Sequence, residues 1–401
     1  MVRSVRLDGE GSDFVVVGAG IAGLTVAAAL ASLGARVLVC EQRTTLAPVG
    51  AGLTVQPNAV LALRRLGLAD ALDDTACVLD SVTITDAAGR VLSALGPHDA
   101  DALRRAVGAP AWGLHRATLH HHLLAAAEAA GVRVRTHARV VSVDPHAASV
   151  TMADGSVETG GLLLGADGLH SRVRPAVLQA AAVSQPAIAE TPVRYSGYTC
   201  WRGVTSDASF PPGWSGEFWG AGRRFGGCTI DGGRTYWFAV VSTPPGGGDR
   251  DGGKASVTRL VEGFARPVRE TVAATPAEAI FRNDISDRAP IATWGVGPTT
   301  LLGDAAHPMT PNLGQGACQG IEDALVLRDQ VATHGATPTA LRMFETIRRG
   351  RANAVVTRAH QLGRIAQLHT PAAVMLRNTA LRLTPSAVLS RQLRDGWTLP
   401  Y

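Results

Sequence analysis

The sequence predicts an α/β protein in which a mostly antiparallel sheet is inserted into a unit built on a parallel sheet, followed by helices. Three observations lead to this prediction. The apolar run 14–17 precedes a glycine-rich turn and an Ala/Leu-rich stretch at 24–33, as in a buried strand that leads into a helix. Between 193 and 281 the pattern alternates and aromatic residues concentrate, which indicates strands with one buried face. Helical periodicity, interrupted by prolines, fills the chain beyond 336.

The first glycine-rich turn has the spacing of a dinucleotide-binding fingerprint. Gly18, Gly20 and Gly23 follow the predicted strand and open the predicted helix, and a second apolar strand ends at Glu41. In such a turn the first glycine permits the tight bend, the second lets the backbone approach a pyrophosphate, and the third allows close helix–strand packing. The helix N-terminus favours the phosphate charge, and Glu41 can accept hydrogen bonds from a ribose. The fingerprint leaves NAD, NADP and FAD open.

Composition excludes several classes of protein. The chain has 401 residues, enough for two or three compact units, and 46% apolar and 18% charged residues are ordinary for a globular protein. Its net charge of +5 is spread along the chain, so we expect no nucleic-acid partner. No apolar run reaches the ~18 residues of a membrane span. The polar start at 1–12 reads as a loose tail without a signal core, so we expect a cytoplasmic protein.

Cysteine and histidine spacing argues against disulfides and metal sites. The five cysteines lie far apart, without a C-x-x-C pair, which favours a reduced chain. His120, His121 and His122 are consecutive and point around a helix, so we expect them to be solvated and expect no metal ligands. The other predicted elements are helices at 58–68, 116–130, 256–264 and 316–332, a hairpin of strands 79–85 and 90–95, short strands between 132 and 159, and buried strands at 162–165 and 299–302.

Two further motifs follow predicted strands. Asp167 opens a D-G-x-x-S-x-x-R pattern that ends at Arg174. Asp304 lies in a G-D-A-A-H-x-x-x-P pattern that leads through the glycine-rich turn 311–316 into a long predicted helix. Each motif alone is compatible with an ordinary turn or helix cap. Three of them in this order, each at the end of an apolar strand, form a specific combination.

With these motifs the chain resembles the group A FAD-dependent aromatic hydroxylases, which share the p-hydroxybenzoate hydroxylase fold, over roughly residues 14–351. Within that group it is most similar to the branch of urate hydroxylase, salicylate-type hydroxylases and zeaxanthin epoxidase. The resemblance implies a Rossmann-like FAD-binding domain, an inserted, mostly antiparallel substrate sheet and a C-terminal helical region. We expect the FAD-binding domain at 13–75, 100–180 and 282–335, the substrate sheet at 76–99 and 181–281, and the helices at 336–401.

The resemblance also implies how FAD is bound. Asp304 is expected to hold a ribityl hydroxyl, and N–H groups of the 311–316 turn to stabilise the anionic reduced flavin. Asp167 is expected to lie behind the pyrophosphate, and in the family this residue is also involved in the use of the nicotinamide donor. Because a second fingerprint is missing, NADH or NADPH is expected only as a transient electron donor. The expected cofactor-binding residues are Gly18, Gly20, Gly23, Glu41, Gln42, Arg116, Val140, Asp167, Asp304, Pro311, Gly314, Gln315 and Gly316.

For the reaction, the resemblance implies hydroxylation of a phenolic or heteroaromatic small molecule by O2 through a C4a-hydroperoxyflavin. Arg224 and Tyr236 occupy positions that orient substrate in the urate hydroxylase pattern, so we expect catalytic and substrate-binding roles for both. The alternatives are purely structural roles, a surface ion pair for Arg224 and sheet packing for Tyr236. Phe238 matches a third lining position. Cys200 stands where the urate pattern has an Asn, which disfavours urate because the pairing amide is lost.

Two other functions stay open at this point. The same fold also supports epoxidation of an alkene natural product, which would require an apolar tunnel beside the flavin rather than a polar pocket. A flavin-binding protein without catalytic activity is the third reading. We expect a monomer or a homodimer, and the substrate and the choice between NADH and NADPH stay open.

Overall fold

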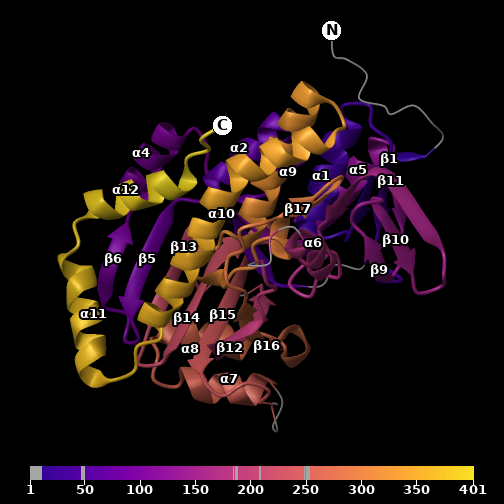
Figure 1. Ribbon diagram of the computed structural model, residues 1–401. Helices are drawn as coiled ribbons and strands as arrows, with labels where there is room; N and C mark the ends of the chain where they lie inside the picture. Colours follow the sequence, from indigo (N-terminus) through magenta and orange to yellow (C-terminus); the bar gives the residue numbers. More distant parts are fainter. Residues whose placement is uncertain are drawn as a thin grey trace.

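The computed structural model describes residues 11–46, 50–183, 185, 188–206, 209–247, 249 and 253–401. Most of the loose tail expected before the first strand, residues 1–10, lies outside the described residues. Two sheets dominate the fold, and the long helix α10 (Pro338–Ala366) runs diagonally across the molecule (Figure 1). The observed architecture, a parallel sheet, a largely antiparallel sheet and C-terminal helices, confirms the predicted fold class.

The first sheet brings the three motifs to one edge. Its parallel strands β11 (Val157–Gly165) and β1 (Ser12–Val17) end immediately before Ala166 and Gly18, and β18 (Thr299–Leu301) ends two residues before Gly303. The carboxyl ends of parallel strands meet at one edge of a sheet. A hairpin of β9 (Val140–Asp144) and β10 (Ser149–Met152) extends from β11. The strand order is β17 (Gly295–Val296), β18 (Thr299–Leu301), β11 (Val157–Gly165), β1 (Ser12–Val17), β2 (Val37–Cys40) and β8 (Arg133–Arg135).

The second sheet has seven strands, and all neighbouring pairs are antiparallel except β5 and β13. A small sheet of β3 (Gly52–Val55), β7 (Ala111–His115) and β4 (Cys77–Leu79) lies next to it. The order of the seven strands is β16 (Phe281–Asp287), β12 (Arg194–Thr205), β15 (Arg234–Ser242), β14 (Arg223–Ile230), β13 (Trp214–Trp219), β5 (Ser81–Asp86) and β6 (Val91–Leu95).

Two details of the second sheet differ from the prediction. We expected the chain to return to the first unit at residue 282, but β16 pairs with β12 and extends the sheet to Asp287. This edge strand carries five polar residues among its seven and lacks the clear alternation that marks the other strands. We also expected one helix in this region, whereas the structure has α7 (Gly253–Val261) and α8 (Arg266–Ala274), because Pro267 starts a new helix at its first turn.

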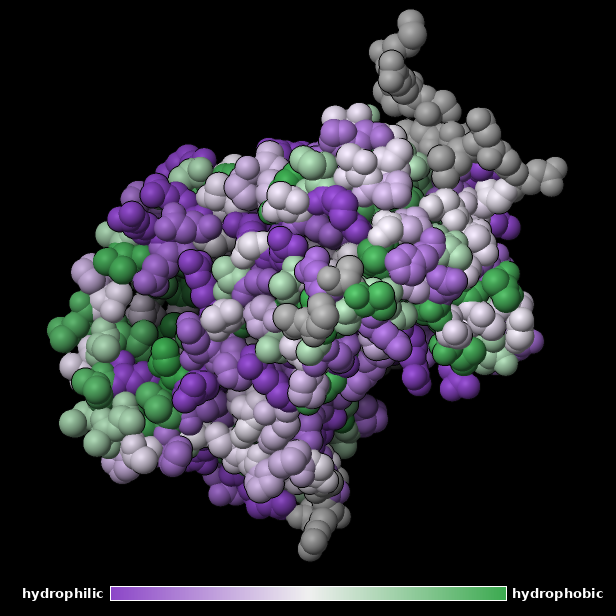
Figure 2. Space-filling model, in the orientation of Figure 1, coloured by the Kyte–Doolittle hydropathy of each residue, from purple (hydrophilic) through white to green (hydrophobic). Residues whose placement is uncertain are grey.

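The C-terminal region consists of α10 (Pro338–Ala366), α11 (Pro371–Leu383) and α12 (Ser386–Trp397). The prolines that interrupt the periodicity lie at the starts of these helices, where a missing N–H costs nothing. Helix α11 lies against β6, and α12 lies against β6 and α4 (Pro97–Val107). Hydrophobic residues gather around α11, at the left of the view in Figure 2. Within the described chain, we find no helix that is both long and apolar enough to cross a membrane.

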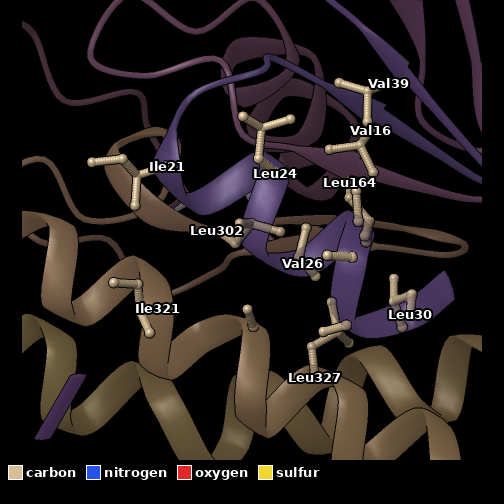
Figure 3. Close-up of a cluster of buried hydrophobic side chains, with 14 of the residues drawn as sticks. Val16, Ile21, Leu24, Val26, Leu30, Val39, Leu164, Leu302, Ile321 and Leu327 are labelled. Atoms are coloured by element: carbon tan, nitrogen blue, oxygen red, sulfur yellow. The ribbon is translucent and has the colours of Figure 1, made fainter. Parts of the chain in front are cut away.

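Helix α1 (Ile21–Ala31) is the centre of the larger core. It packs between the first sheet and α9 (Gly316–His334), and its residues Leu24, Val26 and Leu30 belong to one core with residues of both neighbours (Figure 3). Small residues on both helices permit this packing, since a Cβ on Gly320 of α9 would lie 2.8 Å from the Cβ of Ala22 of α1. The other helices are α2 (Pro57–Arg65), α3 (Asp70–Asp73), α5 (Arg116–Ala129) and α6 (Val173–Ala182), with 3-10 turns at Asp231–Gly233, Ala277–Ala279, Gly303–Ala305 and Pro311–Leu313.

Candidate active site

The glycines of the fingerprint have three different environments. Gly18 has φ +104°, and a Cβ there would lie 2.5 Å from the carbonyl oxygen of Ala166. A Cβ on Gly23 would lie 2.0 Å from the carbonyl oxygen of Gly18. Around Gly20, by contrast, no described atom lies within 4 Å of the Cβ position. The first and third glycines therefore close the turn, and the second leaves open space in which a phosphate can approach the backbone.

Glu41 closes the same turn from the end of β2. Its carboxylate is buried and accepts hydrogen bonds from the backbone N–H of Ala19 (2.8 Å) and of Arg43 (2.9 Å). The expectation that His120 is solvated is wrong, because its Nε2 donates to the carbonyl oxygen of Ala19 (2.8 Å). The same holds for His122, whose Nε2 bonds to the carbonyl oxygen of Leu68 (3.0 Å).

The second motif caps a helix and braces the third motif. Asp167 accepts hydrogen bonds from the Ser171 hydroxyl (2.5 Å) and the N–H of Arg172 (2.6 Å), and burial raises the pKa of its carboxyl. Arg174 is fully buried and donates from Nη1 to the carbonyl oxygens of Ala305 and Ala306, both at 3.0 Å. The two motifs, far apart in the sequence, are thus fixed against each other beside the fingerprint.

The third motif faces open space. The Asp304 side chain lies deep in the molecule but points into a cavity, and the desolvation of this site raises the pKa of the carboxyl while the charges of His307 and Arg116 oppose the rise. The turn that follows reverses direction at Gly314, with φ +62°, and α9 begins two residues later. Free N–H groups at the start of a 19-residue helix favour negative charge.

Gln315 does not reach this cavity with its side chain. The amide donates to Asn58 Oδ1 (3.2 Å) and accepts from Asn58 Nδ2 (3.0 Å) and from Gln319 Nε2 (2.9 Å). These bonds hold the start of α9 against α2. Only the backbone of Gln315 is left for the cofactor contact that we expected.

One cavity of about 1610 Å³ joins the motifs to the second sheet. Side chains alternate along β15, so that Tyr236 and Phe238 face the cavity while Trp237 packs into the aromatic core under α7 and α8. On β12, Cys200 faces the cavity in the same way. The volume exceeds the 300–1,000 Å³ typical of one small-ligand pocket. The expected cofactor residues that line it are Gly18, Gly20, Glu41, Gln42, Arg116, Val140, Asp167, Asp304, Pro311, Gly314 and Gly316.

The comparisons with known proteins agree with this geometry. A family model described as FAD binding domain matches residues 12–359. The chain is 36% identical over 377 residues to aurachin C monooxygenase/isomerase of Stigmatella aurantiaca, which covers 94% of this chain and 95% of the relative. This chain belongs to the FAD-binding group A flavin monooxygenases. It is an FAD-dependent monooxygenase that hydroxylates aromatic or heteroaromatic substrates.

Two other similarities support the assignment of this monooxygenase to the family. It is 30% identical over 383 residues to 2-heptyl-3-hydroxy-4(1H)-quinolone synthase of Pseudomonas aeruginosa, covering 93% of this chain and 94% of the relative. The crystal structure of Klebsiella pneumoniae HpxO complexed with FAD and uric acid matches with a TM-score of 0.85 at 29% identity, over 96% of each chain. The open space at Gly20 and the cavity-facing carboxylate of Asp304 fit a dinucleotide cofactor of this kind.

Arg224 of the monooxygenase lies at the junction of its two sheets, so the alternative of a surface ion pair is wrong. Its side chain is only 2% exposed. The guanidinium donates to Glu217 Oε2 (3.2 Å) and to the side-chain oxygen of Asn312, and lies 5.9 Å from the Tyr198 ring centre. Arg224 therefore connects the substrate sheet to the turn at the start of α9.

Tyr236 is the more accessible of the two predicted catalytic residues of the monooxygenase. Burial raises the pKa of its phenol far above the usual value, against the charge of Arg202, so the hydroxyl keeps its proton at neutral pH. The hydroxyl pairs with the Arg202 guanidinium, which also donates to Asn283 Oδ1 (3.3 Å). A Cβ on Gly52 would lie 2.4 Å from the Cβ of Tyr236, so β3 packs directly on this residue.

Arg202 and Asn283 of the monooxygenase were missed from the sequence, although both line the cavity. The alternation of β12 carried the signal, because Arg202 lies two residues after Cys200 and therefore on the same face. Asn283 pairs with Cys200 across β12 and β16, and that strand was not predicted. Among the described residues, no group of three or more histidine, cysteine or acidic side chains is placed to hold a metal ion. All five cysteines are free thiols.

Proposed function

We propose that this monooxygenase hydroxylates a phenolic or heteroaromatic ring that lies between the turn at Pro311–Leu313 and the face of β15, with NADH or NADPH as a transient electron donor. The observation that carries the proposal is the single cavity shared by Asp304, the turn and Tyr236. When bound, FAD supplies the redox chemistry and the activation of O2. The protein has to bind and orient the substrate and exclude water.

We propose that the nucleotide lies along the cavity wall of the first sheet. Its pyrophosphate would approach the backbone at Gly20, where space is open. Glu41 and Val140 line the end of the cavity expected for the adenosine, and Arg116 and Asp304 line the stretch that leads to the turn. The N–H groups at Gly314 and Gly316 would face the flavin edge that becomes negative on reduction.

Three polar groups in the wall of this cavity favour a substrate with a ring oxygen. Arg202 is cationic, Asn283 offers an amide, and the protonated Tyr236 hydroxyl is both donor and acceptor. Together they can bind the oxygen of a phenolate or enolate, and loss of that proton raises the electron density of the ring. Arg224 would act as a positioning residue, because it holds Asn312 at the turn.

The relatives suggest which rings to test first. One relative is named for a hydroxylated quinolone, and the crystallised HpxO holds uric acid. Cys200 lies in the cavity wall where the urate pattern has an Asn, so we propose a bicyclic heteroaromatic or phenolic ring other than urate.

The direct test is turnover by the purified, FAD-loaded enzyme. Oxidation of NADH or NADPH should accelerate when 4-quinolones, salicylates or other phenols are added, and a product from ¹⁸O2 should carry one labelled oxygen. Urate serves as the matched comparison. A protein without flavin, or acceleration without labelled product across the whole panel, contradicts the proposal.

Epoxidation of an alkene remains a second candidate, and the structure offers a way to weigh it. That reaction requires an apolar wall beside the flavin turn. Arg202, Asn283 and Tyr236 place polar groups in the cavity wall opposite the flavin motifs, which favours hydroxylation of a polar ring. A carotenoid or other alkene that is oxygenated faster than any phenol would favour the alternative.

A further inference from the structure

The cavity continues past the polar chamber toward the far edge of the second sheet. One row of paired residues crosses this face from Arg202 through Phe238 and Gly226 to Glu217, and on to Ile84 of β5. Gly226 gives the Phe238 ring room to lie over the sheet at this point of the row, since a Cβ there would lie 2.5 Å from the ring. Glu217 ends the polar part, because its carboxylate is held by Trp219 Nε1 (2.6 Å) and Arg224.

Beyond Glu217 the walls become apolar. Strands β5 and β6 form one side, and helices α11 and α12 form the other. The apolar residues that line this part of the cavity, which we call the apolar branch, are Val82, Ile84, Leu95, Leu381, Leu389 and Leu393, and the lining contributed by α4 and α12 also includes Asp101, Arg104 and Gln392.

Helix α12 connects the apolar branch to the flavin turn. Leu389, Leu393 and Trp397 are spaced four residues apart and all line the cavity, so one stripe of the helix faces it. Trp397 Nε1 donates to Gln56 Oε1 (2.6 Å), and Gln56 Nε2 donates to the carbonyl oxygen of Leu313 (2.7 Å) in the turn. From Trp397 to Leu389 the wall extends by about 12 Å at the helical rise per residue.

The apolar branch leads toward a hollow on the surface. Figure 2 shows this hollow at the left of the molecule, bordered by hydrophobic residues. Helix α11 exposes large apolar side chains on the same side, with Met375 68% and Leu383 77% exposed. A purely aromatic substrate needs neither the branch nor this rim, and a soluble protein seldom exposes grouped apolar side chains without a function.

We propose that the apolar branch binds a hydrocarbon chain attached to the substrate ring, an alkyl or isoprenoid chain of about seven carbons or more. This inference rests on the proposed function for the position of the ring. With the ring between the turn and Phe238, the chain runs between β5 and α12 toward the hollow. Burial of methylene groups then supplies affinity that the small polar chamber does not, about twofold to fourfold for each methylene.

The test compares ring compounds that differ only in chain length. Binding of 2-methyl- and 2-heptyl-4(1H)-quinolone, and of 4-methyl- and 4-heptylphenol, is measured from the change in flavin absorption of the FAD-loaded enzyme. For each pair we expect the heptyl compound to bind at least about thirtyfold more tightly. In Leu393→Arg this ratio should fall below about threefold, because the charge enters the branch. In the matched control Leu376→Arg, on a side chain that is 72% exposed on α11, the ratio should persist.

A second probe separates this inference from the proposed function. Binding of 11-(dansylamino)undecanoic acid to the FAD-loaded enzyme is followed by dansyl fluorescence, without any turnover. We expect binding that Leu393→Arg weakens at least about tenfold and Leu376→Arg leaves unchanged. Equal binding to all three proteins, or no binding, overturns the chain site even when short phenols are hydroxylated. Dansyl binding that depends on Leu393, together with the absence of hydroxylation of every ring, retains the chain site and overturns the proposed function.

Discussion

The two sheets of this monooxygenase present different kinds of chemical group to the cavity between them. At the edge of the first sheet, the cavity is lined largely by backbone and by the space left at glycines such as Gly20. On the face of the second sheet they are side chains, among them Arg202 and Tyr236. A backbone site needs a fixed local sequence, whereas a side-chain site needs only that strands distant in the sequence lie in register. If the proposed function holds, cofactor specificity is compact in the sequence and substrate specificity is dispersed.

The largest expected effect on cofactor binding tests the backbone side of this comparison. Gly23→Ala places a methyl group 2.0 Å from the carbonyl oxygen of Gly18, so the turn has to shift and we expect loss of FAD and destabilisation by about 1–3 kcal/mol or more. Helix propensity alone predicts the opposite, a gain of about 1 kcal/mol. The FAD content and the free energy of unfolding in urea measure both effects.

Gly20→Ala is the matched control for that substitution. Gly20 has φ −75°, which alanine adopts freely, and no described atom lies near the added methyl group. The apoprotein should keep its stability, while FAD affinity should fall at least about tenfold because the methyl group takes the space of the pyrophosphate. Equal stability of the two apoproteins would contradict the distinction between the glycines.

The next effect concerns the contact between α9 and α10, which holds the flavin turn. Arg348 is fully buried and pairs with Glu322 and with Asp323, whose Oδ1 lies 2.7 Å from its Nε. Arg348→Ala leaves two buried carboxylates without that charge, so we expect a loss of about 3–5 kcal/mol in the free energy of unfolding. The control is Arg358→Ala, an exposed position on the same helix, which should change it by less than about 0.5 kcal/mol. Similar losses of unfolding free energy in both variants would contradict this interpretation.

The same cluster predicts a loss of stability in acid. Burial favours the neutral form of Asp323, but the charges of His307 and Arg348 outweigh it and lower the pKa to about 2. Because the folded pKa is below the unfolded value, the contribution is present above about pH 4 and is lost as the pH falls toward 2. It amounts to about 2 kcal/mol. Unfolding of wild type and Asp323→Asn between pH 5 and 2 measures it, and equal slopes for the two proteins would contradict the assignment.

The limits of sequence reasoning follow the same division between the sheets. The motifs around Gly18, Asp167 and Asp304 predicted the first sheet and FAD, because each lies directly after an apolar strand. Arg202 was missed since a charged residue in an alternating strand looks solvent-facing until the opposite wall is known. That wall includes α12, and no local pattern in 386–397 indicates which cavity its leucines line. Strand β16 was missed because edge strands need less apolar alternation.

On the side-chain face we expect smaller, kinetic effects. Arg202→Gln removes the charge beside Tyr236 and should lower kcat/KM about 10- to 100-fold for a phenolic substrate, with a small change in stability. Arg202→Lys keeps the charge and should recover part of that loss. The pH profile distinguishes a role of Arg202 in stabilising the substrate phenolate from a purely structural role. If the phenolate binds near Arg202, the Gln variant should lose activity mainly at low pH. An unchanged profile and an unchanged kcat/KM would remove Arg202 from the site.

The smallest effect concerns Cys200, a buried side chain in the cavity wall. Cys200→Asn restores the amide of the urate pattern without changing any flavin contact. If specificity is dispersed over the second sheet, this one substitution should raise urate binding by less than about tenfold, because an amide contributes only a fraction of the discrimination that a complete polar site achieves. Turnover of the preferred phenol or quinolone should change by less than about threefold. Full conversion to a urate hydroxylase by Cys200→Asn alone would show instead that substrate choice is as local as cofactor choice.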